Sequence, residues 1–232
     1  MRILAVDTSS QAGSCALWND GILQGEFFLH LSFTHSQTLM PMVESLLEIT
    51  GCRLQQIDFF AVSTGPGSFT GLRIGISTVK GMAMALHKPC IAVSTLAALA
   101  ENMALFDGII LPVMDARRRQ VYTAEFESRN GEIARRTQDG TQSVDTLRER
   151  VIANPIQPVV LVGDGAAMCK DAMADLNHVR IAPESLRHQR AGSVAVAAAR
   201  LAEQGSVCSA ESLHPAYLRL PQAERERMAK LR

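Results

Sequence analysis

Short apolar runs separated by polar turns dominate the first third of the chain. Two of them, residues 2–7 and 13–18, have the length and composition of strands. Asp20-Gly21 is a hairpin signal, and a third run over residues 22–31 alternates loosely after it. The pattern predicts three antiparallel strands with a carboxylate, Asp7, at the first turn.

The next pattern is helical. Residues 36–50 carry apolar side chains over roughly 180° of a helical wheel, which is wider than the stripe of an ordinary surface helix. Gly51 is expected to close this helix, and Pro41 predicts that its regular part begins near that residue. Because a sheet covers only one side, we expect Met42, Leu46 and Ile49 to be left for another partner.

A second helix follows a glycine turn. Residues 57–62 read as a strand, Gly65-Pro66-Gly67 breaks it, and Ser68 or Thr70 can cap a helix that continues to Leu86. Small side chains at this spacing let another backbone approach closely, so this helix is expected to meet a second helix. Burial between two layers of one domain is the alternative. The small face consists of Ile74, Ser77, Thr78, Gly81 and Ala85.

A strand, a glycine turn and a helix N-terminus are the parts of an anion-binding site. The spacing fits poorly. Leu72-Arg73 follow Gly71 where a phosphate-binding G-x-x-x-x-G-K-[ST] loop needs a lysine and a hydroxyl. Only the first half of a G-x-G-x-x-G fingerprint is present. A tight connector between strand and helix is the other interpretation, and the spacing favours it.

The pattern of strand, aspartate, polar turn and strand occurs twice. Residues 109–115 end in Asp115 and lead through a short turn into residues 120–126, as residues 2–7 do around Asp7. This match suggests a duplicated unit. We expect one lobe over residues 1–105 and a second over residues 106–232, whose last segment can return to the first lobe.

The amino-acid composition argues against several classes of protein. The 232 residues have an apolar fraction of 47% and a formal net charge of zero, which supports a full core and argues against a large nucleic-acid or anionic-membrane surface. Five cysteines without a C-x-x-C motif indicate neither a disulfide framework nor a zinc site. Neither a signal peptide nor a transmembrane run is evident, so a reduced, cytoplasmic protein with no membrane partner is expected.

Three groups of polar residues are candidates for chemistry. Asp7 reads either as a metal or phosphate-water ligand or as a turn residue, and the local pattern favours the turn residue. His30 and His35 are five apart, unlike the i, i+4 pair of a helical zinc site, and this spacing favours hydrogen bonding. Arg117, Arg118 and Arg119 can touch RNA phosphate, but so small a basic patch favours a solvated turn.

Several segments match a known superfold. The two strand–aspartate units, the first glycine turn and a second turn at Gly163-Asp164-Gly165 resemble the actin, hexokinase and Hsp70 (ASKHA) superfold. This resemblance implies an α/β, two-lobed, duplicated fold with mixed sheets flanked by helices.

More closely, the chain resembles the TsaB (YeaZ) family, the smaller paralogues of the catalytic subunit TsaD in the Kae1/TsaD group. The matching segments extend from residue 3 to residue 219. They are ILAVDTSSQAGSCALW, HSQTLMPMVESLL, STGPGSFTGLRIGISTVKGMAMAL, VSTLAALA, MDARRRQVYTAEF, LVGDGA and PAYLR.

The resemblance implies a non-catalytic subunit that pairs with TsaD through helices of the N-terminal lobe. It would stabilise TsaD during N6-threonylcarbamoyladenosine (t6A) formation at position 37 of tRNA. In that family TsaC supplies the threonylcarbamoyl-adenylate and TsaE is an ATPase partner. This chain has no H-x-x-x-H pair, by which the catalytic subunit holds its metal. We therefore expect no catalysis, no cofactor and no metal, and a homodimer when the partner is absent.

Pattern and resemblance together give two sets of residues. The expected partner interface consists of Leu39, Met42, Val43, Leu46, Ile74, Ser77, Thr78, Gly81 and Ala85. The expected vestigial nucleotide site consists of Asp7, Gly65, Gly67, Ser68, Asp115, Gly163 and Gly165. The competing hypothesis is a small ATP-binding kinase or hydrolase of the same superfold, in which Asp7 and Asp115 hold magnesium-phosphate. A peptidase has little support, because no Ser/Cys–His arrangement is visible.

Overall fold

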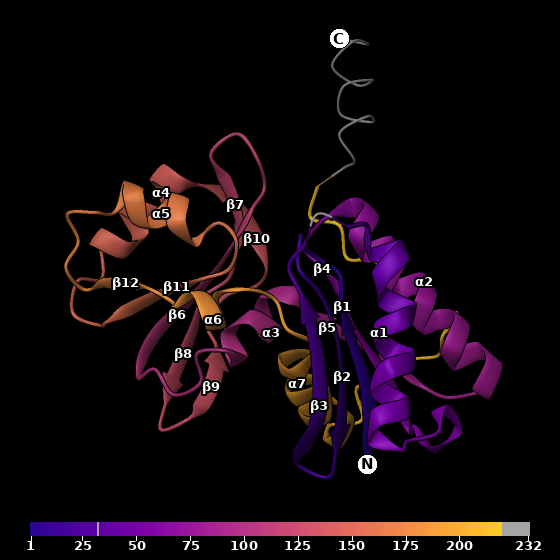
Figure 1. Cartoon of the computed structure of the whole chain (residues 1–232). Coiled ribbons are helices and arrows are strands. Elements are labelled where there is room, and N and C mark those ends of the chain that lie inside the picture. The colour runs from indigo at the N-terminus through magenta and orange to yellow at the C-terminus, as the bar shows by residue number, and fades with distance from the viewer. Residues whose placement is uncertain (32, 220–232) are drawn as a thin grey trace, which may run out of the picture.

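Two sheets, each flanked by helices, form two lobes that lie side by side (Figure 1). The structure is a computed structural model and describes residues 1–31 and 33–219. Residues 222–232, whose sequence QAERERMAKLR carries mixed charge, lie outside the described residues. Within the described ranges no helix is long and apolar enough to span a bilayer.

The N-terminal sheet has five strands in the order β3-β2-β1-β4-β5. β1 pairs antiparallel with β2, and β2 pairs antiparallel with β3, so the three predicted antiparallel strands are confirmed. β4 and β5 add in parallel. The strands are β1 (Arg2–Asp7), β2 (Gly13–Asn19), β3 (Ile22–Leu29), β4 (Phe59–Gly65) and β5 (Cys90–Ser94).

Two helices, α1 (His35–Thr50) and α2 (Phe69–Leu86), cover the outer face of this sheet (Figure 1). Ser68 is the N-cap of α2, since its side chain accepts a hydrogen bond from the Gly71 N–H at 3.2 Å. Gly51 ends α1 in the left-handed conformation, as predicted. A short 3-10 helix, Leu54–Gln56, leads from α1 to β4.

The prediction that the regular part of α1 begins near Pro41 is wrong, because the helix already begins at His35. Proline cannot donate to the carbonyl four residues earlier, which here belongs to Gln37. Pro41 and Gln37 are both exposed, so water can reach that carbonyl. The helix therefore tolerates a proline that sequence rules place at its start.

The C-terminal sheet has the strand order β10-β7-β6-β11-β12, and in addition β8 pairs with β6 and β9 pairs with β8. α4 and α5 cover one of its faces. α6 follows β12. The elements are β6 (Gly108–Asp115), β7 (Gln120–Thr123), β8 (Phe126–Arg129), β9 (Glu132–Arg135), β10 (Gly140–Ser143), α4 (Val144–Ile152), β11 (Val159–Val162), α5 (Ala166–Ala172), β12 (Val179–Ile181) and α6 (Glu184–Arg187).

Two helices, α3 (Thr95–Glu101) and α7 (Ala191–Glu203), lie between the two sheets (Figure 1). α7 is rich in alanine and packs closely on the inner face of the N-terminal sheet. Leu96 and Leu99 of α3 pack instead against the C-terminal sheet. The late helix α7 thus belongs to the core of the first lobe, while the boundary near residue 105 stays a prediction.

The second strand–aspartate unit repeats the first. β6 pairs antiparallel with β7 and parallel with β11, as β1 pairs with β2 and with β4. Asp7 and Asp115 both lie at the ends of their strands. This is the duplicated, two-lobed α/β arrangement with mixed sheets that the superfold resemblance implied.

Candidate functional site

Asp7 is buried in the N-terminal lobe, and both of its carboxylate oxygens accept hydrogen bonds from the same lobe. Its Oδ1 accepts hydrogen bonds from the Ser9 N–H at 2.9 Å and from Ser9 Oγ at 2.8 Å, and its Oδ2 accepts one from Ser63 Oγ. Burial raises the pKa of this carboxyl, although the bonds from Ser63 and Ser9 oppose that rise. The carboxylate is therefore held by its own lobe instead of facing open solvent.

The glycine turn before α2 packs against backbone. The Ser68 N–H donates to Ser9 O at 2.7 Å, and a Cβ on Gly67 would lie 2.4 Å from the same oxygen. Gly65 has φ +140° and faces Ala216, whose carbonyl oxygen would lie 2.4 Å from a Cβ. Carbonyl oxygens of the chain thus lie against the turn that would cradle a phosphate, and glycine is needed for this close approach.

The second glycine turn is similarly close-packed. Gly163 has φ +114°, and a Cβ there would lie 2.3 Å from Val113 O. The Gly165 N–H donates to the same oxygen at 3.0 Å. Asp164 Oδ1 accepts from the Asp115 N–H at 3.2 Å. Burial raises the pKa of the Asp164 carboxyl; the bond from Asp115 N–H opposes this, and the nearby Asp115 charge adds to it.

A cleft of about 650 Å³ lies between the lobes, a size typical of small-molecule sites. Its walls come from residues 9–11 and 66–70 of the first lobe, from 114–117 of the second, and from 216–219. Of the predicted nucleotide-site residues, Gly67, Ser68 and Asp115 line the cleft. Four do not, and they are Asp7, Gly65, Gly163 and Gly165.

The segment 216–219 forms one wall of the cleft and joins the lobes. The Tyr217 ring stacks on Phe69 with centroids 4.8 Å apart, and Arg73 Nε donates to the Tyr217 hydroxyl at 3.0 Å. Arg219 Nη1 donates to Ala116 O of the second lobe at 2.8 Å. The sequence analysis assigned no site residue to this segment, although its PAYLR motif is among those that match the family.

The α1 half of the predicted partner interface is buried within the chain. Leu39, Met42, Val43 and Leu46 are buried in the core of the first lobe, where they pack under α1 with residues of the sheet and of α2. The wide apolar arc of α1 is buried because this helix packs against both the sheet and α2. Ile49 alone among the side chains expected to be unpartnered is exposed, at 75%.

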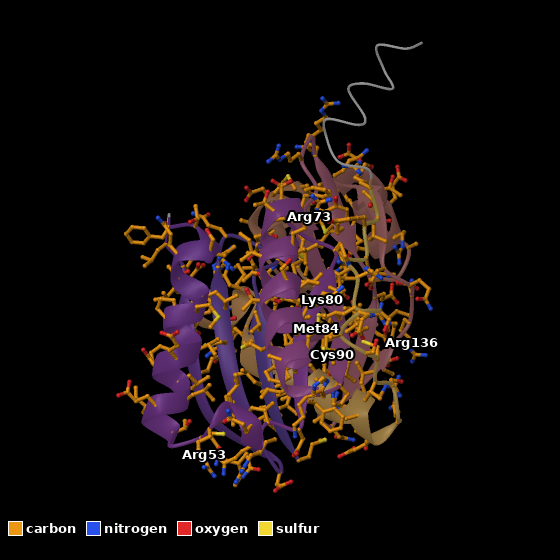
Figure 2. The ribbon with its side chains drawn as sticks, turned by 90° about the vertical axis from the view of Figure 1, so that its right-hand side faces the viewer. Arg53, Arg73, Lys80, Met84, Cys90 and Arg136 are labelled. Carbon is orange, nitrogen blue, oxygen red and sulfur yellow. The ribbon has the colours of Figure 1, made fainter. Side chains whose placement is uncertain are left out.

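The α2 half of that prediction lies at the surface. Ser77, Gly81 and Ala85 are exposed, and Ile74 and Thr78 are half-buried. We call these five residues the α2 stripe. An ideal Cβ on Gly81 would meet no heavy atom within 4 Å. Arg73, Lys80 and Met84 follow one another along α2 beside the stripe (Figure 2). The stripe is thus a surface of mostly small side chains on α2, and it is open at Gly81.

The histidines have hydrogen-bonding or packing neighbours. His35 Nε2 lies 2.7 Å from Ser10 O, and the His30 ring contacts His188 edge-on with centroids 4.5 Å apart. Among residues 1–31 and 33–219, no group of three His, Cys, Asp or Glu side chains has a metal-binding arrangement.

Comparisons with known proteins identify the family. The model of the family TsaD, tRNA N6-adenosine threonylcarbamoyltransferase, matches residues 30–227. The chain is 33% identical to the tRNA threonylcarbamoyladenosine biosynthesis protein TsaB of Bacillus subtilis, over 97% of this chain and 96% of that protein. The chain belongs to the TsaB/YeaZ family. TsaB of Escherichia coli is 34% identical, over 94% of this chain and 95% of that protein.

The YeaZ structure from Pseudomonas aeruginosa has the same fold. It superposes with a TM-score of 0.77 at 29% identity, covering 94% of this chain and 99% of that chain. The resemblance to the TsaB/YeaZ family is thereby confirmed over nearly the whole chain.

Proposed function

We propose that this chain is the non-catalytic subunit that binds and stabilises a TsaD-like catalytic subunit in t6A formation at position 37 of tRNA. The observation that carries the proposal is the contrast between two places. The α2 stripe is open to a partner, whereas the Asp7 carboxylate accepts hydrogen bonds from Ser9 and Ser63 of the same chain. Membership of the TsaB/YeaZ family supports the same pathway.

The partners follow from the family. The stripe would take a helix of the TsaD-like subunit, because small side chains allow two helices to approach closely. A TsaE-like ATPase and a TsaC-like synthase would act with the pair in the cytoplasm, and tRNA would reach the complex they form. Without its partner, the same patch would form a two-fold homodimer.

Reconstitution tests the role. Modified nucleoside would be counted by mass spectrometry after reaction of purified TsaC-, TsaD- and TsaE-like partners, with and without this chain. We expect modification to collapse without the chain and to be restored by the wild type and by Asp115→Asn, which alters an exposed carboxylate.

Unchanged modification without the chain would overturn the proposed role. ATP hydrolysis by the isolated chain that Asp115→Asn abolishes would favour the alternative, a small ATP-binding kinase or hydrolase. Calorimetry with magnesium-ATP checks the same point, and we expect no binding to the isolated chain.

A further inference from the structure

Two cysteines that are far apart in the sequence lie opposite each other at the edge of the N-terminal sheet. Cys90 begins β5, and Cys208 belongs to the segment that follows α7. The Cys90 N–H donates to Cys208 O at 2.8 Å, and the Cys208 N–H donates to Cys90 O at 2.9 Å. This reciprocal pair of bonds is an antiparallel bridge, in which the two residues are direct partners.

The two side chains lie on the same side of the sheet. Direct partners in an antiparallel pair point to one face, with Cβ atoms about 4.5–5.5 Å apart. Cys90 is buried in the core between the sheet and α2, and Cys208 packs against that core. A disulfide joins Cβ atoms about 3.5–4.5 Å apart, so a small approach of the two residues would allow their sulfurs to bond.

Cys208 is the more accessible of the two cysteines. It lines a hollow of about 500 Å³ together with Met84 and Val207, which are 49% and 44% exposed. Cys90 has an exposed fraction of 0% and does not line this hollow. A small reagent that enters the hollow would therefore meet Cys208 first.

The surroundings of the two thiols also differ. Burial raises the pKa of both thiols, and that of Cys90 reaches about 11. At Cys208 this rise is opposed by hydrogen bonds from the Ser212 side chain and from the Ala92 backbone, which favour the thiolate. Because the thiolate is the nucleophile in disulfide exchange, Cys208 is suited to react first and Cys90 to react second.

Metal binding is the other common use of paired cysteines. Over the described ranges 1–31 and 33–219, His, Cys, Asp and Glu side chains form no group of three that could hold a metal ion. A structural zinc site needs four ligands, so two opposed thiols alone favour a disulfide.

We propose that Cys90 and Cys208 form a reversible disulfide when the chain meets a small-molecule disulfide such as oxidised glutathione. The Cys208 thiolate attacks one sulfur of the reagent and displaces one glutathione thiolate, which takes up a proton. The Cys90 thiol then loses its proton and attacks the Cys208 sulfur, which displaces the second glutathione. The two cysteines lose two electrons and two protons, and the reagent gains them.

The disulfide would fasten the segment that forms one wall of the interlobe cleft. After Cys208 this segment is held by hydrogen bonds, since Lys80 Nζ donates to two of its carbonyl oxygens and the Ala216 N–H donates to Thr64 O at 2.8 Å. Residues 216–219 then line the cleft. A covalent link at Cys208 would restrict local opening of the segment and so hold this wall more firmly.

The test treats the full chain with oxidised glutathione at pH 8 and follows it by intact mass and by peptide mapping without reductant. We expect a glutathione adduct on Cys208 that gives way to a linked Cys90–Cys208 peptide pair, and dithiothreitol should reverse both. Cys90→Ala should retain the adduct, because the second thiol is absent. Cys208→Ala should form no linked pair. Cys52→Ala removes another partly buried thiol and should form the pair like the wild type.

Hydrogen exchange measures the effect on the segment. Amides of residues 208–216 should exchange several-fold more slowly in the oxidised wild type than in the reduced one, and the same treatment of Cys208→Ala should change nothing. Thermal unfolding shows whether each reduced variant is folded. A folded wild type whose Cys208 adduct never gives way to the pair would overturn the proposal. Linked peptides containing Cys52 in equal yield would do the same, because they would indicate random pairing.

Discussion

The neighbours of Asp7 determine what its carboxylate can bind. It ends β1 in the position of a strand-end carboxylate, and its two oxygens are taken by Ser9 and Ser63. Local pattern alone favoured a turn residue over a ligand, and the Ser9 bonds agree with that interpretation. Ser63 of β4 donates to the other oxygen, so both carboxylate oxygens of Asp7 have partners within the chain.

The buried Asp7 carboxyl gives a pH-dependent prediction. Because burial raises its folded pKa above the unfolded value of about 3.9, the folded state holds the proton more tightly, and the stability so gained is lost as pH rises through the folded pKa. Asp7→Asn does not titrate. The free energy of unfolding of Asp7→Asn relative to wild type should therefore rise between pH 4 and pH 8 in urea titrations.

Exposed Asp171→Asn on α5 measures the general effect of losing one carboxylate. A relative free energy for Asp7→Asn that follows this control at every pH would show that burial does not raise the pKa of Asp7.

The cysteines give a second residue-level prediction. Burial raises the pKa of Cys15 and Cys169 to about 12 and that of Cys90 to about 11, so few thiolates form near neutral pH. Cys52 and Cys208 are only partly buried. An aromatic disulfide reagent at pH 8 should label these two first in the native protein. Peptide mass spectrometry identifies the labelled residues, and early labelling of Cys15 or Cys169 would contradict the buried environment.

At the scale of the element, α2 combines two glycines with opposite surroundings. A Cβ on Gly75 would lie 2.3 Å from Thr8 Oγ1, whereas a Cβ on Gly81 would meet nothing within 4 Å. The Thr8 hydroxyl cannot move freely, because it donates to Gly71 O at 2.8 Å. The same residue type thus serves close packing on the sheet at one position and an open surface at the other.

This contrast predicts opposite effects of one substitution within one helix. Gly81→Ala should raise the free energy of unfolding by about 1 kcal/mol, since alanine is the better helix former. Gly75→Ala should lower it by roughly 1–3 kcal/mol because the methyl group overpacks the site against Thr8. Urea unfolding at one pH measures both. A stabilising Gly75→Ala would mean that α2 can shift away from the first turn.

At the scale of the whole molecule, the end of the described chain returns to the first lobe and reaches the second. Cys208 and Cys90 exchange backbone hydrogen bonds of 2.8 and 2.9 Å, and Lys80 Nζ donates to Leu213 O at 3.2 Å. Arg219 then bonds to Ala116 of the other lobe. Residues 216–219 of this segment form one wall of the cleft, and residues before them pass Lys80 of α2.

Pairing is the prediction that belongs to this scale. Gly81→Leu should abolish binding to the TsaD-like subunit and also the homodimer, because a bulky side chain blocks close approach on the stripe. The unfolding midpoint should stay at or above that of the wild type, since the site is open and leucine is a better helix former than glycine. Sedimentation velocity measures both associations.

Ala167→Leu, exposed on α5 of the other lobe, is the matched control and should leave both associations intact. A Gly81→Leu protein that still holds its partner would place the interface elsewhere.

Local signals in the sequence predicted most strands and helices of the first lobe and their order. The Ser68 cap, the Gly51 stop and the two strand–aspartate units all depend on neighbouring residues. The superfold and family were likewise readable from contiguous motifs.

Which surfaces remain open depends on the packing of elements that are distant in sequence. Leu46 and Met42 look unpartnered on a helical wheel, but a sheet and α2 together bury the whole arc. Ser63 donates a hydrogen bond to Asp7, which is 56 residues away in the sequence. Ala216, near the end of the described chain, packs against Gly65. Contacts between residues so distant in sequence depend on how the layers pack, which no local pattern records.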